Sequence, residues 1–583
     1  MTPIIDPRRG DVEDDASSTK RRSLLAIAGT LLAEISIPKL VLAWTCLLLL
    51  PAIMLGLTPL IVSAWLATLS RKIAALFSDA WPLSVVALML AVGFVGGRPM
   101  LRAAELGFWS LNAVAVQPAY AIFRECLRHL TEHVVAAPPA RVRAAMAAAA
   151  GLMLCAVGLA IVALAWPASR WVGTLEDLAS PHRLVLPALA NVAVILGAYL
   201  AVGCLAWGIA DATMDQPHDL PTLDSLCDGL RTWRIAHLSD LHVVGERYGF
   251  RIESGRSGPC GNARLARVLA RLEQEHGDRP LDLVLITGDV TDAGRSAEWA
   301  EFLAALALFP ELAKRTLILP GNHDVNVVDR ANPARVDVPT NPGRRLRQLR
   351  ALSAMYAVQG GRVRVVDPAT MRLGDTLACT LAPYRDRMAA FADTGSLRLS
   401  VELAGVWPSV FPMVLPPATD DGLGVMLLNS TAEAHFSFTN ALGLVSSTQA
   451  RALAAVADQF PRAHWILALH HHLVEYPRLG SALSERIGTA LINGTWFVRR
   501  LQPLGERVVA MHGHRHIDWV GECGSLRIVS APSPVMEATD DMPTYFLLHR
   551  LAVGLDNRLH LLAPEPIKIA GDARHEVAVA AAL

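Results

Sequence analysis

The chain has 583 residues, a length too great for one compact hydrophobic core, so we expect at least two regions. Its 53 Lys and Arg residues balance 53 Asp and Glu residues, and this formal charge of zero removes any general argument for a nucleic-acid partner. The eight cysteines are scattered without a C-x-x-C spacing, which argues against a disulfide framework and a zinc knuckle. Apolar residues make up 52% of the chain because residues 1–210 are far more apolar than the remainder.

Residues 1–39 predict a basic, disordered N-terminal tail that leads into an interfacial helix. The tail is too polar to be a signal peptide ahead of the first long apolar run. An apolar stretch at 24–35 is interrupted by Glu34 and stopped by Pro38, so we expect it to lie at a membrane surface. The basic residues of the tail are Arg8, Arg9, Lys20, Arg21 and Arg22.

Residues 40–210 predict a helical transmembrane region with about four spans. A helix needs about 20 apolar residues to cross about 30 Å of hydrocarbon. The candidate spans are 40–66, 81–97, 144–166 and 184–209. A fifth stretch, 106–123, is barely long enough and contains polar residues and a proline, so we expect it to be interfacial.

The arginines between the second and third candidate spans predict the orientation of the chain. They share one side of the membrane with the basic N-terminus, and the positive-inside rule places that side in the cytoplasm. An even number of spans then returns the chain to the cytoplasm, whereas a fifth span would place everything after residue 210 outside. We therefore expect an integral, multi-pass protein with a cytoplasmic catalytic domain. The spans carry no embedded charge cluster, so an anchor is favoured over a transport pathway.

After a polar linker at 211–231, residues 232–565 predict an α/β domain, followed by a C-terminal tail at 566–583. Short apolar runs alternate with helical segments, the pattern of an α/β core. Ligands of such sheets bind beyond the carboxyl ends of the strands. The expected strands are 234–238, 281–286, 316–319, 425–428, 465–469, 508–511, 526–529 and 545–551, and the expected helices are 262–276, 296–308 and 447–459.

Two segments of this domain depart from the pattern. Residues 324–364 are rich in arginine, and a solvated basic face is favoured there over contact with lipid headgroups or substrate phosphate. Residues 403–417 are apolar and rich in proline. They fit a buried edge of the core and a cap over the site equally well.

Five short motifs follow the strand-like runs and supply Asp, Asn and His side chains. They are Asp240-Leu241-His242, Gly288-Asp289, Gly321-Asn322-His323-Asp324, His470-His471-His472 and Gly513-His514-Arg515-His516. Each spacing is common alone, but the complete ordered set resembles the calcineurin-like metallophosphoesterases over about residues 232–551. The resemblance implies a four-layer α/β/β/α sandwich after the transmembrane region.

The same resemblance implies a role for each motif residue. Asp240, His242 and His516 would bind one metal, and Asp289 would bridge to a second metal completed by Asn322, His470 and His514. His323 would act beside the scissile phosphate, with Asp324 orienting its ring and Asp292 in support. The family often has His-His-Pro-Pro where this chain has His470-His471-His472-Leu473, so His471 stays open as an alternative ligand to His470.

Two divalent ions at such a site can clamp phosphoryl oxygens and bind a hydroxide that attacks phosphorus in line. Mixed Asp, Asn and His ligation suits manganese, iron or zinc better than calcium. We expect a membrane-anchored hydrolase of a phosphoester or pyrophosphate bond, with a lipid-linked phosphate and a cyclic nucleotide both open as substrates. The alternative is a catalytically inactive sensor or scaffold with the same fold, which the complete ligand set disfavours.

Overall fold

In the computed structural model, the described residues are 2–11, 49–76, 116–132, 139–174, 181–220, 222–224, 231–247, 261–329, 341–434, 437–477, 491–536 and 543–570, with the single positions 45, 112, 177, 335 and 337. They form two compact units. The helical unit is residues 37–214, and the catalytic unit combines residues 1–36 with residues 215–583.

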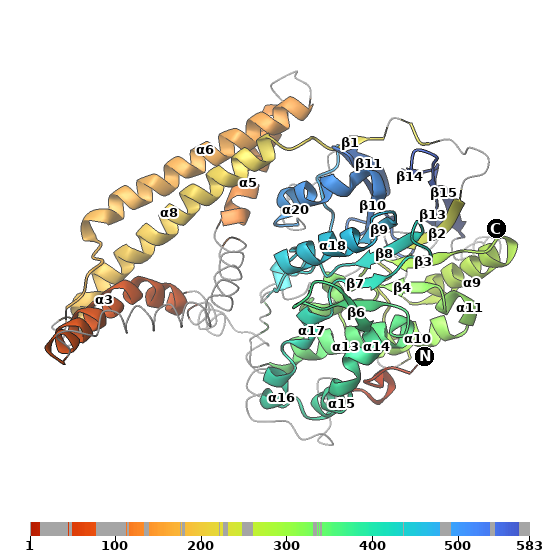
Figure 1. Ribbon diagram of the computed structural model, residues 1–583, viewed down its shortest axis with the longest axis horizontal. Helices are drawn as coiled ribbons and strands as arrows, with labels where there is room; N and C mark the ends of the chain where they lie inside the picture. Colours follow the sequence, from red (N-terminus) through yellow and green to blue (C-terminus); the bar gives the residue numbers. More distant parts are fainter. Residues whose placement is uncertain are drawn as a thin grey trace, which may run out of the picture. The chain divides into compact units, whose positions relative to one another are not determined.

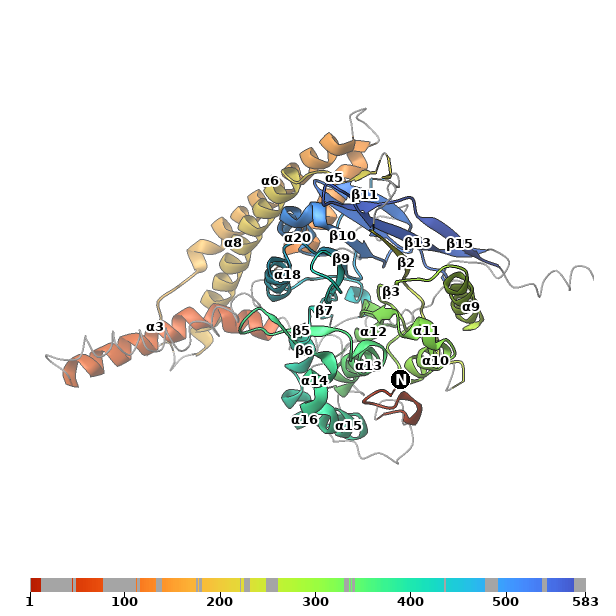
Figure 2. The same cartoon turned by 45° about the vertical axis from the view of Figure 1, so that its right-hand side comes forward.

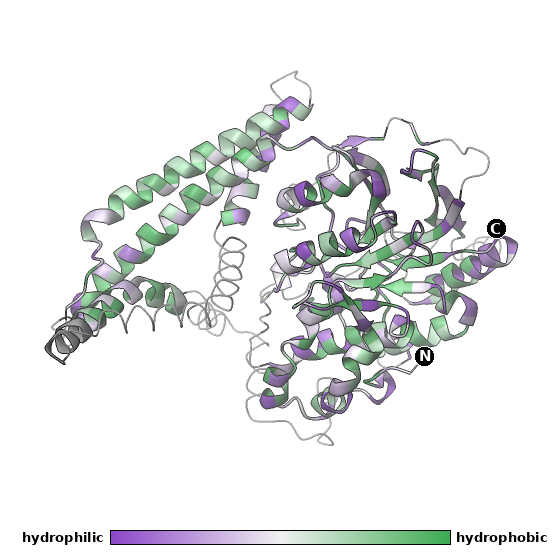
Figure 3. Cartoon of the chain, viewed as in Figure 1, coloured by the Kyte–Doolittle hydropathy of each residue, from purple (hydrophilic) through white to green (hydrophobic). Residues whose placement is uncertain are grey.

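Among the described residues, the helical unit has three long apolar helices, α3, α6 and α8, and one shorter amphipathic helix, α5 (Figures 1 and 3). Glycines let the backbones of α6 and α8 approach closely: a Cβ added at Gly158 would lie 2.5 Å from the carbonyl oxygen of Gly197. Small residues of this kind are typical of helix pairs in membranes. The helices are α3 (Leu50–Leu76), α5 (Gln117–Glu132), α6 (Pro139–Ala165) and α8 (Val185–Ala212), with short 3-10 turns η4 (Trp166–Ala168) and η5 (Pro181–Leu184).

Two helical segments of the described residues, Ala140–Ala168 and His182–Ala212, are long and apolar enough to cross a membrane. They contain the candidate spans 144–166 and 184–209, whereas the apolar part of α3, Ala52–Ala67, is shorter. The candidate 81–97 lies outside the described residues, and 40–66 and 106–123 are described only in part. The predicted multi-pass region is therefore supported only to the extent of these two helices.

The catalytic unit contains two mixed β-sheets (Figure 1). The nine-stranded sheet has the order β1-β11-β12-β10-β9-β8-β7-β5-β6, and the six-stranded sheet has the order β14-β13-β2-β3-β4 with β15 paired to β13. Parallel pairing joins β2, β3 and β4 in one sheet and β8, β9, β10 and β12 in the other. The strands are β1 (His218–Asp219), β2 (Arg231–Leu238), β3 (Leu283–Ile286), β4 (Thr316–Ile318), β5 (Arg364–Val366), β6 (Leu373–Thr376), β7 (Met413–Leu415), β8 (Leu423–Leu427), β9 (His464–Ala468), β10 (Val508–His512), β11 (Trp519–Cys523), β12 (Leu526–Ser530), β13 (Thr544–Val553), β14 (Leu559–Leu561) and β15 (Glu565–Ile569).

Helices cover the two sheets on different sides (Figure 2). The helices α9, α10 and α11 lie beside β2–β4, and α18 and α20 lie beside β9 and β10. The helices are α9 (Ala263–Asp278), α10 (Ser296–Ala307), α11 (Pro310–Ala313), α12 (Asn322–Val325), α13 (Pro342–Gln359), α14 (Leu377–Leu381), α15 (Arg385–Thr394), α16 (Leu397–Glu402), α17 (Val406–Ser409), α18 (Ser447–Gln459) and α20 (Gly494–Leu501), with 3-10 turns η1 (Pro7–Arg9), η6 (Ala382–Tyr384), η7 (Ser437–Thr439) and η8 (Gln502–Arg507).

One hydrophobic core joins the inner faces of both sheets. Ile235 and Leu285 of the six-stranded sheet belong to the same buried cluster as Ile466 and Val509 of the nine-stranded sheet. The central strands read as continuous apolar runs because both of their faces are covered. The predicted α/β sandwich is thus confirmed, and each strand expected from the sequence overlaps an observed one. The boundaries given for the separate domains stay predictions.

In the arginine-rich segment 324–364, helix α13 packs into the core, so the interpretation as a solvated basic face is wrong for this helix. Arg347 forms a buried ion pair with Asp337, and Arg350 forms another with Asp11. The helix is amphipathic only weakly because it is covered on most sides and satisfies its charges internally.

The apolar segment 403–417 forms a buried edge of the core. Leu403, Val410 and Met413 are fully buried, and the rings of Trp407 and Phe411 contact each other edge to face with centroids 5.1 Å apart. Of the two alternatives, the cap over the site therefore does not hold.

Candidate metal centre

All seven predicted metal ligands lie just beyond the carboxyl ends of parallel strands. In the six-stranded sheet, Asp240 and His242 follow β2, Asp289 follows β3, and Asn322 begins α12 after β4. His470 follows β9, and His514 and His516 follow β10 of the other sheet. The backbone N–H of His514 donates to Asp240 Oδ2 at 2.9 Å, which joins the two sets of loops.

Three of these side chains converge around the ring of His470, which is itself a predicted ligand. Its Nε2 lies 3.1 Å from Asn322 Oδ1, 3.0 Å from His514 Nδ1 and 3.3 Å from Asp289 Oδ2. The other ring nitrogen, Nδ1, lies 2.8 Å from the carbonyl oxygen of Thr287 and must donate to it, because a carbonyl can only accept. The lone pair of Nε2 therefore points at the common centre, as a metal ligand requires.

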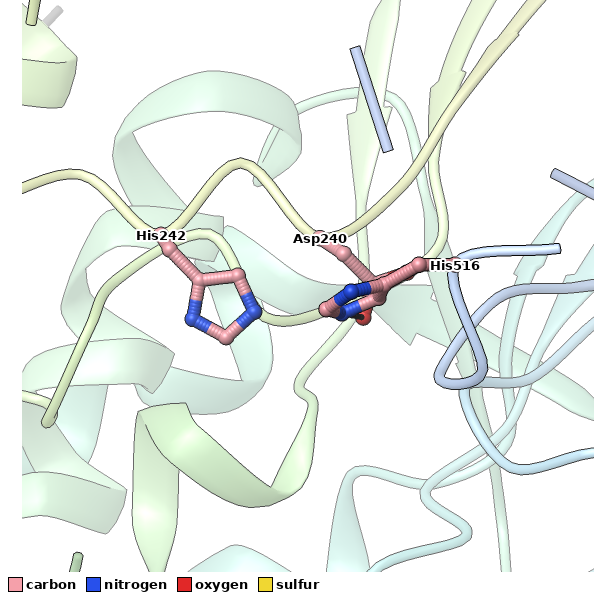
Figure 4. Close-up of side chains that lie close together, drawn as sticks. All are labelled: Asp240, His242 and His516. Atoms are coloured by element: carbon pink, nitrogen blue, oxygen red, sulfur yellow. Dashed lines mark ion pairs between the residues drawn. The ribbon is translucent and has the colours of Figure 1, made fainter. Parts of the chain in front are cut away.

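A second group brings together Asp240, His242 and His516 (Figure 4). Asp240 and His242 extend from one loop and His516 from another, and one ligand atom from each residue lies within 4.8 Å of the others. His516 Nε2 is 3.4 Å from Asp240 Oδ1, and His242 Nε2 is 3.8 Å from Asp289 Oδ2. Asp289 therefore lies between the two groups, where a bridging carboxylate is expected.

The loops reach this arrangement through backbone conformations that most residues avoid. The five ligands Asp240, His242, Asp289, His514 and His516 all have positive φ angles between 44° and 76°. Such strain of roughly 1–3 kcal/mol per residue persists only where the surrounding fold enforces it, and it gathers at functional sites. At Gly513 an added Cβ would lie 1.8 Å from Ser239 Oγ, so a glycine is required there.

The triple histidine divides into three different environments. His470 lies in the cluster, whereas His471 Nδ1 contacts Ser430 Oγ at 2.9 Å and His472 Nε2 contacts Glu475 Oε1 at 3.2 Å. The geometry therefore favours His470 over His471 as the ligand candidate.

His323 is held by a different residue from the one expected. Its Nδ1 lies 2.8 Å from the backbone oxygen of Asp292, and its Nε2 is 4.0 Å from Asp289 Oδ2. The Asp324 carboxylate instead accepts hydrogen bonds from the hydroxyl of Thr291 at 2.6 Å and from the backbone of Gly321 at 2.9 Å. Asp324 thus fixes the loop that carries His323, and the ring is oriented by Asp292.

Burial and the carboxylates of Asp240 and Asp289 shift the pKa values of the site in opposite directions. Burial alone would raise the pKa of Asp289, but His470 and His323 hold that pKa well below its usual range. Burial would lower the pKa of His470, but Asp289 and Asp240 overcome it and raise the pKa to about 9. Burial, together with Asp289, raises the pKa of Asp324 to about 6. Burial and neighbouring imidazoles lower the pKa of His242 to about 3. The buried carboxylates of Asp240 and Asp289 therefore attract positive charge, and a bound cation would take the place of the proton on His470 Nε2.

The donor set also fits divalent metals chemically. Carboxylate, amide oxygen and imidazole together suit manganese, iron or zinc. Among the described residues, His514 Nε2 is buried and has no hydrogen-bond partner, and Asp240 Oδ1 faces only the imidazole of His516 at 3.4 Å. Buried polar atoms are rarely left without a partner in folded proteins, and a bound metal would engage such atoms. The residues present therefore fit a metal pair.

The motifs assign no role to Ser430, which follows the strand expected at 425–428. Its hydroxyl accepts hydrogen bonds from the backbone N–H groups of His470 and His471, at 3.2 and 3.1 Å. Ser533 was also missed, and its hydroxyl donates to the backbone oxygen of Asp240 at 2.7 Å. The signal for Ser430 was its position directly after β8, beside the strand that precedes the triple histidine.

One known protein family matches part of the chain. Residues 234–367 match the sequence model of the family described as Calcineurin-like phosphoesterase, as the resemblance predicted. The match supports a hydrolase that acts on phosphoric ester bonds. It includes Asp240, Asp289 and Asn322 and ends before the histidines of the other sheet. No curated protein matches the chain.

Solved structures resemble the chain weakly. A dimetal phosphatase from Danio rerio is 12% identical, with 58% of this chain and 99% of that chain covered and a TM-score of 0.33. The NAD nucleotidase of Haemophilus influenzae is 12% identical, with 58% and 51% covered and a TM-score of 0.29. A purple acid phosphatase from yellow lupin is 13% identical, with 60% and 55% covered and a TM-score of 0.27. The chain thus spans about half the length of the last two proteins.

Proposed function

We propose that the chain is a membrane-anchored, metal-dependent phosphohydrolase. Two divalent cations would be held by the seven converging side chains, with Asp289 shared between them. When bound, such ions neutralise phosphoryl oxygens and lower the pKa of a coordinated water. One observation carries the proposal: ligand candidates from inside and from outside the family match lie together in one site. Those inside the match are Asp240, Asp289 and Asn322, and those outside it are His470, His514 and His516.

His323 is the residue proposed to handle the proton. Its Nδ1–H donates to the Asp292 carbonyl, which leaves Nε2 facing the site beside Asp289. The side chain of His323 is 18% exposed, whereas that of Asp289 is 3% exposed, so a substrate could reach the imidazole. A protonated Nε2 there would donate to the leaving oxygen, a step that general acids accelerate about 10²–10⁴-fold.

The anchor is proposed to be the α6–α8 pair, with other apolar segments of residues 40–210 in support. Large apolar side chains such as Leu164 and Val202 are 83% and 70% exposed, which suits contact with lipid. A phosphate ester near a membrane, lipid-linked or a cyclic nucleotide, is the proposed substrate, and the catalytic unit is proposed to face the cytoplasm.

The test uses the purified full chain with manganese and both a phosphate monoester and a phosphate diester of nitrophenol. We expect turnover by the unaltered protein and a loss of about 10³-fold or more in Asp289→Asn, because bridging and charge balance both fail. His323→Ala should lose about 10²–10⁴-fold while its metal content is retained.

The matched control is Asp420→Asn, which removes an exposed carboxylate paired with Arg462. It should keep full turnover. If the unaltered chain binds metal but hydrolyses neither ester, nor phospholipids and cyclic nucleotides, the inactive scaffold replaces the hydrolase.

A further inference from the structure

The first residues of the chain pack onto the catalytic unit, although they precede the apolar region in sequence. Pro3, Ile5 and Pro7 line a small cavity together with Trp299 of α10 and Ser353 of α13. Ile5 is 6% exposed and belongs to the main hydrophobic core. Its backbone N–H donates to Ser353 Oγ at 2.8 Å. The segment 2–11 is therefore ordered, which corrects the expectation of a disordered tail for these residues.

A buried ion pair also holds residues 2–11 against the catalytic unit. Both oxygens of Asp11 accept from the guanidinium of Arg350 at 2.5 Å, and the two side chains are 0% and 2% exposed. Ser296 Oγ donates to Asp11 at 3.0 Å, and Arg350 also donates to the backbone oxygen of Gly294 at 2.9 Å. A buried arginine requires its partner, because removal of one charge leaves the other uncompensated. Asp11 is thus an integral part of the catalytic unit.

The contact between Asp11 and Arg350 restricts how often the chain can cross the membrane. The apolar region, residues 37–214, lies in the sequence between Asp11 and the rest of the catalytic unit. A charged pair buried in a water-soluble fold forms only when both chain segments are on the same side of the membrane. We propose that residues 2–11 and residues 215–583 occupy one compartment, so the chain between them crosses the membrane an even number of times. This inference rests on the membrane anchoring proposed above.

The proposal limits the number of membrane crossings more strictly than hydropathy does. The adjacent helices α6 and α8 account for two crossings. The three remaining apolar stretches, 40–66, 81–97 and 106–123, must then contribute either none or two. A fifth span, which would place the catalytic unit outside, is excluded. Arg8 and Arg9 are exposed on the docked segment, and they favour the cytoplasm as the shared compartment.

The test compares the sidedness of two tags on the full-length chain in cells. One protein carries an epitope ahead of Met1, and the other carries it after Leu555, which is fully exposed between β13 and β14. We expect antibody to reach both epitopes only after the membrane is permeabilised. Access to one epitope but not the other in intact cells overturns the proposal. Access to both in intact cells supports the even count and overturns the cytoplasmic orientation.

Hydrogen exchange of the full chain in detergent tests the docking itself. Amides of residues 2–11 should exchange at least about tenfold more slowly than in a free peptide of the same sequence. Asp11→Asn should lose this protection, whereas the control Arg9→Gln, at an exposed side chain, should keep it. Exchange at the rate of the free peptide in the unaltered protein overturns the proposal. Neither measurement depends on turnover, so an inactive chain would count against the hydrolase alone.

Discussion

The catalytic unit buries polar side chains at one site, whereas the helical unit exposes large apolar side chains. In the catalytic unit, Asp240, Asn322 and His470 are fully buried at the ends of apolar strands. In the helical unit, glycines lie at the contact between α6 and α8, while Leu164 is 83% exposed. The first arrangement places the polar groups in a site and the apolar groups in a core, as water requires. The second places large apolar groups at the surface, which suits the membrane anchoring proposed above.

This difference implies that substitutions in the two units should have separable effects. Changes at the strand ends should abolish chemistry while the helices stay intact. Changes at the helix contact should weaken the helical unit and leave turnover unaffected.

The largest expected effect distinguishes His470 from its neighbour. His470→Ala removes the imidazole at the centre of Asn322, His514 and Asp289, so we expect loss of one metal and about 10³-fold of turnover. His471→Ala is the matched control, since His471 contacts Ser430, and it should keep both metals. Metal content measured by elemental analysis and turnover of an aryl phosphate decide between them. The reverse result would make His471 the ligand.

The next largest effect concerns the Asp11–Arg350 pair. Asp11→Ala should lower the free energy of unfolding of the catalytic unit by about 3–5 kcal/mol, because Arg350 is left buried and uncompensated. The double variant Asp11→Ala with Arg350→Met should recover part of this loss. Denaturant unfolding, monitored by the loss of turnover, measures the free energy of unfolding of the single and the double variant.

The exposed pair of Arg462 with Asp420 provides the control for this prediction. Arg462→Met should change the free energy of unfolding by less than about 1 kcal/mol, as is usual for exposed pairs. Equal costs at the buried and the exposed pair would show that residues 2–11 contribute nothing to the catalytic unit.

The sequence predicted the α/β core well because its central strands are buried on both faces and read as plain apolar runs. The strand expected at 281–286 is observed as β3, and the helix expected at 447–459 is α18 with the same bounds. Short edge strands such as β6 were not predicted, since Leu373–Thr376 is mostly polar and half-buried. Their conformation depends on pairing with β5, which no local pattern encodes.

The site was predictable as a set of residues but not as a set of contacts. The motif order identified Asp289 and His470, because both follow apolar strands. It assigned Asp324 to the ring of His323, whereas a backbone oxygen of Asp292 holds that ring. Backbone acceptors carry no sequence signal. The packing of Asp11 on Arg350 joins residues 339 positions apart, and it too has no local signature.

A moderate effect is expected in the helical unit. Gly158→Leu places a large side chain where a Cβ already meets the Gly197 carbonyl at 2.5 Å, and overpacking of this kind costs about 1–3 kcal/mol. Thermal unfolding of the helices in detergent, followed by circular dichroism, should show the loss, while turnover should be unchanged. Val157→Leu, at an exposed neighbouring position, is the control and should be neutral. Loss of turnover in Gly158→Leu would break the separation of the two units.

The smallest effect depends on pH and lies within the catalytic unit. Burial lowers the pKa of His549 to about 4, and neither ring nitrogen has a hydrogen-bond partner among the described residues. Below the unfolded pKa of about 6.5, the unfolded chain takes up a proton that the folded chain cannot, so stability falls as pH drops towards 4.

His549→Leu should remove this loss, with a gain in free energy of unfolding over the unaltered protein of about 1 kcal/mol at pH 5.5. Burial also lowers the pKa of the facing imidazole of His237, 5.5 Å away between ring centroids, and His549 lowers that pKa further. The difference between the two unfolding curves therefore reports His549 together with its effect on His237. Urea unfolding at pH 8 sets the baseline, because His549 is neutral there in both the folded and the unfolded protein. If the two proteins differ in free energy of unfolding by the same amount at pH 8 and pH 5.5, His549 gains a proton in the folded protein as readily as in the unfolded one.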